Sequence, residues 1–212
     1  MSRRFIYTPS IVQILLILNG LVYLLIMLAP APLFEYFALW PLGLSAQAYA
    51  EGVAPHFQIW QLVSYSFLHG GYFHILINMY VLWMFGTRIE QAWGSKAILI
   101  YYFVCVIGAG LVQLLVSSMA ARAGEIYPTV GASGGVFGLL LAFALTFPRE
   151  RLMLLFPPII LQARWLALIY AIIELVAGVT GTLEGIAHFA HLGGMLFGFL
   201  LLLYWGKHPL RP

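Results

Sequence analysis

A serine within a glycine-rich segment is the first candidate for chemistry in this sequence. In YPTVGASGGVFGLLL, Ser133 lies between Gly131 and Gly134, at the point where a polar segment becomes an apolar one. A serine hydroxyl is a weak nucleophile at neutral pH and needs a general base beside it. The fold must therefore bring a base to Ser133 if this serine is to attack a carbonyl carbon.

A histidine in a second glycine-rich segment is the candidate base. The segment AHLGGMLFG contains His191, followed by Gly194 and Gly198 spaced four apart. Gly134 and Gly138 have the same spacing after the serine. Glycines four apart give a helix a face of small residues on which another helix packs closely. If the two faces meet, the serine and the histidine come within hydrogen-bonding reach.

A third segment offers hydrogen-bond donors. In HGGYFHILINMY, His74 and Asn78 are spaced i, i+4 and therefore share one helix face. Side-chain donors of this kind stabilise the oxyanion that forms during acyl transfer. The start of the helix that carries Ser133 adds free backbone N–H groups and the positive end of a helix dipole. Together these residue types predict a site for acyl transfer.

The acidic residues limit the form that this site can take. All seven are glutamates, so a Ser-His-Asp triad is impossible, and no glutamate has an obvious position from which to replace the aspartate. Glu174 lies near the middle of an apolar segment, where a charge is costly, and we expect a neutral, hydrogen-bonded structural carboxyl there. A two-residue Ser-His dyad remains.

The i, i+3 spacing of His188 and His191 raises the alternative of a metal site. The HExxH pattern of an intramembrane metalloprotease is absent from the sequence, as is any aspartate ligand. We therefore expect no metal and no cofactor, and we expect His188 to lie at the rim of a pocket.

The elements that must position these residues are membrane-spanning helices. Of the 212 residues, 63% are hydrophobic and 8% are charged, whereas a soluble domain carries about 25% charged residues. Apolar runs of about 20 residues recur, as is typical of transmembrane helices. We expect one domain over residues 1–212, with the lipid bilayer as a partner. No segment has the basic character of a nucleic-acid-binding surface, so we expect no nucleic-acid partner.

Six helices fit the apolar pattern, at about 10–28, 71–87, 96–118, 131–147, 164–180 and 186–205. The first run imitates a signal peptide, but it exceeds the usual core of about 7–15 residues and Pro32 follows the mock cleavage site. We expect it to be retained as the first helix. The first connection, at about 29–70, is rich in aromatic residues and proline, and we expect it to lie partly in the membrane interface.

The basic residues predict the orientation of these helices. One set of helix ends carries Arg3, Arg4, Arg88, Lys96, Arg149, Arg151, Arg164, Lys207 and Arg211. The opposite set carries only Arg122. Positive charge favours the cytoplasmic side, so we expect both termini to be cytoplasmic and the site to open to the extracytoplasmic side. The second, fourth and sixth helices then begin on that side, which places the candidate residues at one depth.

The fourth predicted helix is short. Its 131–147 range spans about 25 Å, less than the hydrocarbon core of about 30 Å. Pro148 stops it at the cytoplasmic end, so the shortfall lies at the outer end and Ser133 lies below the membrane surface. Irregular backbone at that depth must face protein or water, which predicts a sunken, water-filled pocket.

With these residues the sequence resembles the rhomboid family of intramembrane serine proteases over nearly the whole chain. GASG matches the family's GxSG and AHLGGMLFG matches AHxxGxxxG, which implies Ser133 as nucleophile and His191 as base. HGGYFHILIN matches the second-helix pattern, which implies His74 and Asn78 as oxyanion-holding side chains. The resemblance implies an all-α, six-transmembrane-helix bundle in a bacterial cell membrane. It also implies single-pass or multi-pass membrane proteins as substrates, cleaved near their extracytoplasmic ends.

A further match and two departures complete the resemblance. IEQAWG matches the family's ExxxG, with Glu90 and Gly94 at the turn after the second helix. Where members often carry Trp-Arg in the first loop, this chain has Trp60-Gln61, which bears on loop packing more than on chemistry. Where many bacterial members have tyrosine four residues after the nucleophile, this chain has Phe137, whose ring can still stack on the base and orient it.

Two other functions remain open. A catalytically inactive relative would bind membrane proteins without cutting them, but such relatives typically lose the serine or the histidine, and both are present here. A transporter or proton channel would use His74 and His191 but would not explain Ser133 in GxSG. It also predicts polar residues that continue toward the cytoplasm, where the even-numbered helices are almost wholly apolar.

Overall fold

The computed structural model describes residues 9–44, 46–153, 158–182 and 185–207, so Arg3, Arg4 and Arg211 lie outside the described residues. Its long helices are α1 (Ile11–Leu28), α5 (Tyr72–Val81), α7 (Ser95–Arg122), α8 (Ser133–Thr146), α9 (Ala163–Thr180) and α10 (His188–Lys207). Each of the six helical ranges expected from the sequence overlaps one of them, although α7 extends four residues beyond its expected end. The fold is mostly helical, as predicted.

The second helical segment is continuous but changes its winding. α5 runs into the π-helical turn η2 (Leu82–Gly86) and then into α6 (Thr87–Trp93). By length and composition, four helices of the described chain can cross a membrane, namely α1, α7, α9 and residues His188–Gly206 of α10. α8 is apolar but has only 14 residues. It begins at Ser133, two residues later than expected.

Two connections contain elements that the sequence pattern did not predict. The first connection holds α2 (Pro30–Phe37), α3 (Ala46–Ala50), α4 (Gln61–Ser64) and the 3-10 turn η1 (Tyr65–Phe67). A two-stranded antiparallel sheet of β1 (Arg151–Met153) and β2 (Ile160–Gln162) joins α8 to α9. The chain is therefore not purely helical. Pro148 and Pro158 disfavour a helix here, because proline cannot donate the backbone hydrogen bond that a helix needs.

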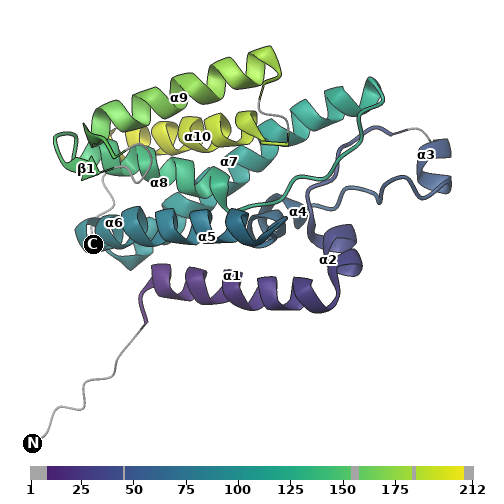
Figure 1. The fold of residues 1–212 in the computed structure, drawn as a ribbon, viewed down its shortest axis with the longest axis horizontal. Helices are drawn as coiled ribbons and strands as arrows, with labels where there is room; N and C mark the ends of the chain where they lie inside the picture. The colour runs from purple at the N-terminus through teal and green to yellow at the C-terminus, as the bar shows by residue number, and fades with distance from the viewer. Residues whose placement is uncertain (1–8, 45, 154–157, 183–184, 208–212) are drawn as a thin grey trace, which may run out of the picture.

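α10 lies inside the bundle and contacts α7, α8 and α9 (Figure 1). α9 packs on α10 and α8 at one side, while α1 packs beneath the α5–η2 segment at the other. α7 and α8 supply several of the largest buried side chains, namely Tyr101, Tyr102, Leu139 and Phe143. α8 and α10 are thus packed against neighbouring helices on several sides.

The outer helices present apolar side chains to their surroundings. Leu21 and Leu25 of α1 and Ile172 and Val176 of α9 are each more than half exposed. Lipid tails are as apolar as leucine, so such faces are stable in a bilayer. The apolar spans and these exposed faces identify an integral membrane protein.

The Gln61 side chain links two parts of the first connection. The side chain is fully buried. Its Oε1 accepts the backbone N–H of Trp40 at 3.3 Å, and its Nε2 donates to the Tyr36 carbonyl at 3.3 Å. A backbone bridge between Leu39 and Thr129 then ties this connection to the segment before α8. The glutamine therefore packs the loop at the position where family members often carry arginine.

Glu90 joins three helices at one end of the bundle. Its carboxylate accepts the N–H groups of Ile11 at 2.8 Å and Val12 at 3.1 Å, which begin α1, and the Ser95 hydroxyl at 2.6 Å, which begins α7. A carboxylate also suits the positive end of a helix dipole. Gly94, with a φ of +84°, lets the chain turn from α6 into α7. These contacts give the ExxxG segment a structural role.

Hydrogen bonding sets the charge state of Glu90. Burial alone would raise its pKa, but the bonds from Ser95, Val12 and Ile11 lower the pKa overall. A carboxyl with a lowered pKa stabilises the fold above its unfolded-state pKa. That stabilisation is lost as the pH falls through the lower, folded-state pKa.

We expect Glu90→Gln to lower the free energy of unfolding at pH 7 by about 1–3 kcal/mol, because the amide removes the charge and one acceptor. Thermal unfolding of the detergent-solubilised protein measures this change. The difference between wild type and variant should begin to shrink as the pH falls below the ordinary glutamate pKa of about 4, and it should be lost as the pH falls through the lowered pKa of the folded carboxyl. A difference that stays constant with pH contradicts this role for Glu90.

Candidate active site

Ser133 is the first residue of α8, directly after a glycine turn. Gly131 has a φ of +128°, and its N–H donates to the Tyr65 carbonyl at 3.0 Å. A β-carbon on Gly131 would lie 2.8 Å from His74 Nε2 and 3.6 Å from Ser133 Oγ. The glycine therefore allows the backbone turn and also leaves open the small space that the serine and His74 border.

The helices of the serine and the histidine touch through their glycines. A β-carbon added at Gly194 of α10 would overlap the carbonyl oxygen of Gly134 of α8. A β-carbon at Gly138 would lie 3.3 Å from the Gly194 carbonyl oxygen. At Gly194 only glycine permits so close an approach of the two backbones, whereas a β-carbon at Gly138 would first overlap Cys105 Sγ of α7.

Gly198 differs from the sequence-based expectation that it faces α8. A β-carbon there would overlap the Tyr101 hydroxyl of α7 and would lie 2.9 Å from Cys105 Sγ. The same sulfur crowds Gly138 of α8. Cys105 therefore occupies the space between the two helices at this level, so Gly198 packs on α7.

The contact at Gly194 brings Ser133 to His191. The distance from Ser133 Oγ to His191 Nε2 is 2.8 Å. The imidazole is buried and the serine is half-buried. Phe137, one turn after the serine, stacks on the imidazole with ring centroids 4.2 Å apart and planes 7° apart. Tyr170 of α9 meets the Phe137 ring edge-on at 6.0 Å.

His74 and Asn78 lie on the second helical segment as hydrogen-bond donors. The Gly70 N–H donates to His74 Nδ1 at 3.4 Å, which requires an unprotonated Nδ1 and leaves the proton on Nε2, toward Gly131. Asn78 donates one N–H to the His74 carbonyl at 2.8 Å. An amide has two N–H groups, so the second is available for another acceptor.

His69 is a buried neighbour of His74. Its ring meets the His74 ring edge-on at 5.0 Å. Burial, reinforced by the neighbouring His74, lowers the pKa of His69 to about 4. The side chain is therefore neutral at physiological pH and adds no charge to the site.

Glu174 has a place at the site that the sequence did not reveal. Its Oε2 lies 2.6 Å from His188 Nδ1 and 3.0 Å from His191 Nδ1. The second contact is an ion-pair contact and not a well-directed hydrogen bond. His188, expected at a pocket rim, is buried against this carboxyl. The signal in the sequence was a carboxyl within an apolar helix, which indicates a buried polar partner. The sequence does not show that this partner lies on α10.

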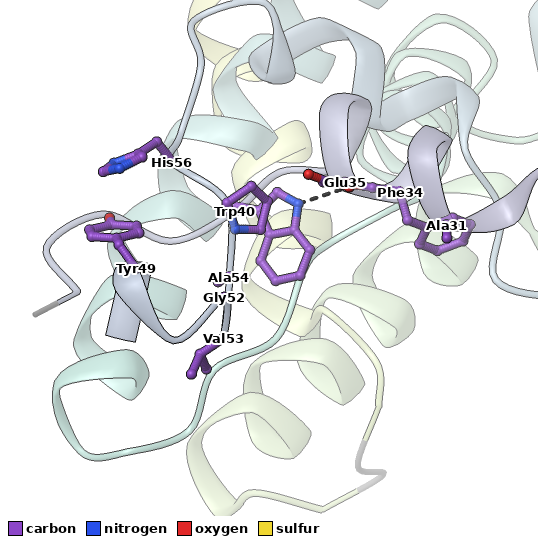
Figure 2. Close-up of a pocket in the computed structure, with 10 residues that line it drawn as sticks. Ala31, Phe34, Glu35, Trp40, Tyr49, Gly52, Val53, Ala54 and His56 are labelled. Atoms are coloured by element: carbon purple, nitrogen blue, oxygen red, sulfur yellow. Dashed lines mark hydrogen bonds between the residues drawn. The ribbon is translucent and has the colours of Figure 1, made fainter. Parts of the chain in front are cut away.

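The described residues contain no group of three or more His, Cys, Asp or Glu side chains placed to hold a metal ion. They do enclose a cavity of about 460 Å³ within the first connection, where Trp40 lies between α2 and residues 49–56 (Figure 2). Its lining consists of Ala31, Phe34, Glu35, Trp40, Tyr49, Gly52, Val53, Ala54, Pro55 and His56. None of the predicted site residues lines it, so it is not the pocket expected above Ser133.

Residues 56–208 match the family model of the Rhomboid domain, which is more than half of the chain. The chain belongs to the rhomboid family. Members of this family are generally serine proteases.

Three relatives give the extent of the similarity. The presenilin-associated rhomboid-like protein, mitochondrial, of Rattus norvegicus is 34% identical over 66% of this chain and 36% of its own length. RHOMBOID-like protein 5 of Arabidopsis thaliana is 35% identical over 67% of this chain and 42% of its own. Rhomboid protein 1, mitochondrial, of Saccharomyces cerevisiae is 30% identical over 69% and 42%. This rhomboid chain thus spans less than half the length of these relatives.

We expect Gly194→Ala to force α8 and α10 apart and to lower the free energy of unfolding by about 1–3 kcal/mol, as overpacking of a core does. Gly206→Ala is the matched control, because it lies on the same helix with nothing within 4 Å of an added β-carbon. Thermal unfolding in detergent compares the two variants. Equal stability of Gly194→Ala and Gly206→Ala would show that the close helix contact is not required.

Proposed function

We propose that this rhomboid protein is an intramembrane serine endopeptidase that acts through a dyad of Ser133 and His191. The observation that carries the proposal is the 2.8 Å contact between Ser133 Oγ and His191 Nε2. It lies in an apolar helical bundle, where polar side chains are costly and usually serve a function. The hydrogen-bond donors of the second helical segment, at the same end of α8, support the same chemistry.

The first step is attack on the scissile carbonyl. Ser133 Oγ bonds to the carbonyl carbon while its proton passes to His191 Nε2. The developing oxyanion accepts hydrogen bonds from the Ser133 backbone N–H, from His74 Nε2 and from the free N–H of Asn78. The Ser133 N–H is suited to this because the first N–H groups of a helix lack an intrahelical acceptor.

The second step releases the products. His191 gives its proton to the leaving amine, and the peptide bond breaks to leave an acyl-enzyme on Ser133. The same histidine then takes a proton from water, which attacks the acyl group and frees the carboxylate product. Stacking on Phe137 favours this chemistry because it holds the imidazole in one orientation throughout.

The proposal includes six membrane spans in one domain over residues 1–212. The six spans are α1, the second helical segment over about 71–87, α7, α8, α9 and α10, and the first connection lies partly in the membrane interface. Arg88, Lys96 and Arg164 occur at helix ends at one end of the bundle, whereas Arg122 ends α7 at the other. This bias supports cytoplasmic termini and a site that opens to the extracytoplasmic side.

Substrates in this proposal are single-pass or multi-pass membrane proteins, cut near their extracytoplasmic ends. They enter laterally between helices, past α9 and the overlying loop. The location proposed from the family resemblance is a bacterial cell membrane. The relatives above, two of which are named mitochondrial, lend that location no support.

We expect a fluorophosphonate probe to label the detergent-solubilised wild type and to leave Ser133→Ala and His191→Ala unlabelled. The reason is that the probe reacts only with a serine that has a base beside it. Incubation with a model transmembrane substrate should then yield two fragments with the wild type and none with either variant. Undiminished labelling of Ser133→Ala would contradict the nucleophile assignment. A protein that binds the substrate without labelling or cleavage would instead be a binding relative.

Removing one oxyanion donor tests the second part of the site. We expect Asn78→Ala to lower kcat by about 10²–10³-fold with little change in KM, because this donor acts mainly on the transition state. Asn19→Ala is a matched control, since Asn19 is also buried and also donates its Nδ2 to a carbonyl four residues earlier, at 2.8 Å. The cleavage rate, corrected for the amount of folded protein, should be much lower for Asn78→Ala than for Asn19→Ala. Equal rates would remove Asn78 from the mechanism.

A further inference from the structure

A buried carboxyl group faces the candidate base from the neighbouring helix. Glu174 of α9 is 6% exposed, and its Oε2 contacts Nδ1 of both His188 and His191. Nε2 of His191, on the other edge of the ring, contacts Ser133 Oγ. Hydroxyl, imidazole and carboxyl therefore form a continuous series across α8, α10 and α9.

Close packing of α9 on α10 gives Glu174 this position. A β-carbon at Gly178, one turn beyond Glu174, would lie 3.2 Å from the β-carbon of His188. A larger residue would therefore press the two helices apart at this level. A carboxyl near the middle of an apolar helix is costly unless it is paired, and the two imidazoles of α10 supply the pairing.

We propose that Glu174 is a positioning residue for His191. Its carboxylate lies 3.0 Å from Nδ1, and its negative charge favours the form of the ring with the proton on Nδ1. Nε2 is then free to accept the Ser133 proton, and the carboxylate balances the positive charge that forms on the ring. The proton moves from Ser133 Oγ to His191 Nε2 and later to the leaving amine, while Glu174 takes up none. This inference rests on the Ser133–His191 chemistry proposed above.

His188 anchors the carboxyl, because its 2.6 Å contact with Glu174 is shorter than the 3.0 Å contact that His191 makes. Phe137 covers one face of the His191 ring. The imidazole is thus held on its face by an aromatic ring and at its Nδ1 edge by a carboxyl. This arrangement gives the base one orientation without an aspartate.

Charged and titratable side chains face His191 from several neighbouring elements. From α9 it faces Glu174, from α10 it has His188, and from the second helical segment His74 lies near enough to act on it electrostatically. On the α7 side, Tyr101 and Cys105 contact α10 two turns away, at Gly198. Glu174 is therefore the anion closest to the base among the described residues.

The rate of fluorophosphonate labelling and of substrate cleavage, measured against pH on the full solubilised chain, tests this role. We expect Glu174→Gln to slow both by at least about tenfold, since the amide lacks the charge that stabilises the protonated ring. The acid limb of the profile should move to lower pH by about one unit. Glu174→Asp keeps the charge, so its acid limb should stay close to that of the wild type while its rate falls less.

Glu90→Gln is the matched control, because Glu90 is likewise a buried carboxyl, 8% exposed, but lies at another part of the bundle. It should lower the melting temperature and leave the pH profile in place. If Glu174→Gln does not fold, Glu174→Asp carries the test. Aspartate is one methylene group shorter, so its carboxylate lies farther from His191 and labelling should still be slower than in the wild type.

Three results would overturn the inference. One is a Glu174→Gln profile that superimposes on the wild-type profile. Another is a glutamine variant more active than the aspartate variant, which would mean that shape and not charge matters. A third is a Glu174→Asp rate equal to that of the wild type. A wild type that neither labels nor cleaves would overturn the proposed function itself, and the role of Glu174 with it.

Discussion

The candidate active site depends on one close contact between two helix backbones. Gly194 of α10 lies against the Gly134 carbonyl of α8, with no room for a β-carbon between them. Ser133 is the residue before this contact on α8, and His191 is one turn before it on α10. The contact therefore sets the 2.8 Å distance between Oγ and Nε2. Proton transfer needs a distance of this size, so a small change in helix spacing would separate the nucleophile from its base.

A second constraint acts on every polar side chain in this apolar bundle, because such a group is costly unless it has a partner. Glu90 meets the constraint at the starts of α1 and α7, and Gln61 meets it at backbone groups of the first connection. Glu174 meets it at the two histidines of α10. The first two pairings hold the fold together. The third lies beside the candidate base, which is why we assign it a part in the chemistry.

Much of this architecture follows from local patterns in the sequence. Apolar runs predicted the positions of the helices, and the paired glycines predicted the close approach of the helices that carry Ser133 and His191. The start of α8 was missed by two residues because Gly131 adopts a positive φ and ends the loop instead of beginning the helix. The place of Gly198 was missed because Cys105 fills the space between the helices. Glu174 was visible as an unusual residue, but its partners are on another helix, and no pattern in its own segment marks the two histidines of α10 as those partners.

The central claim is that Ser133 is a nucleophile activated within the membrane domain. Tandem mass spectrometry of the fluorophosphonate-treated wild type tests it most directly, because the adduct can be assigned to one residue. The account predicts a single adduct on Ser133, formed by folded protein and absent after heat denaturation. An adduct on a different residue, or labelling that survives denaturation, would contradict it.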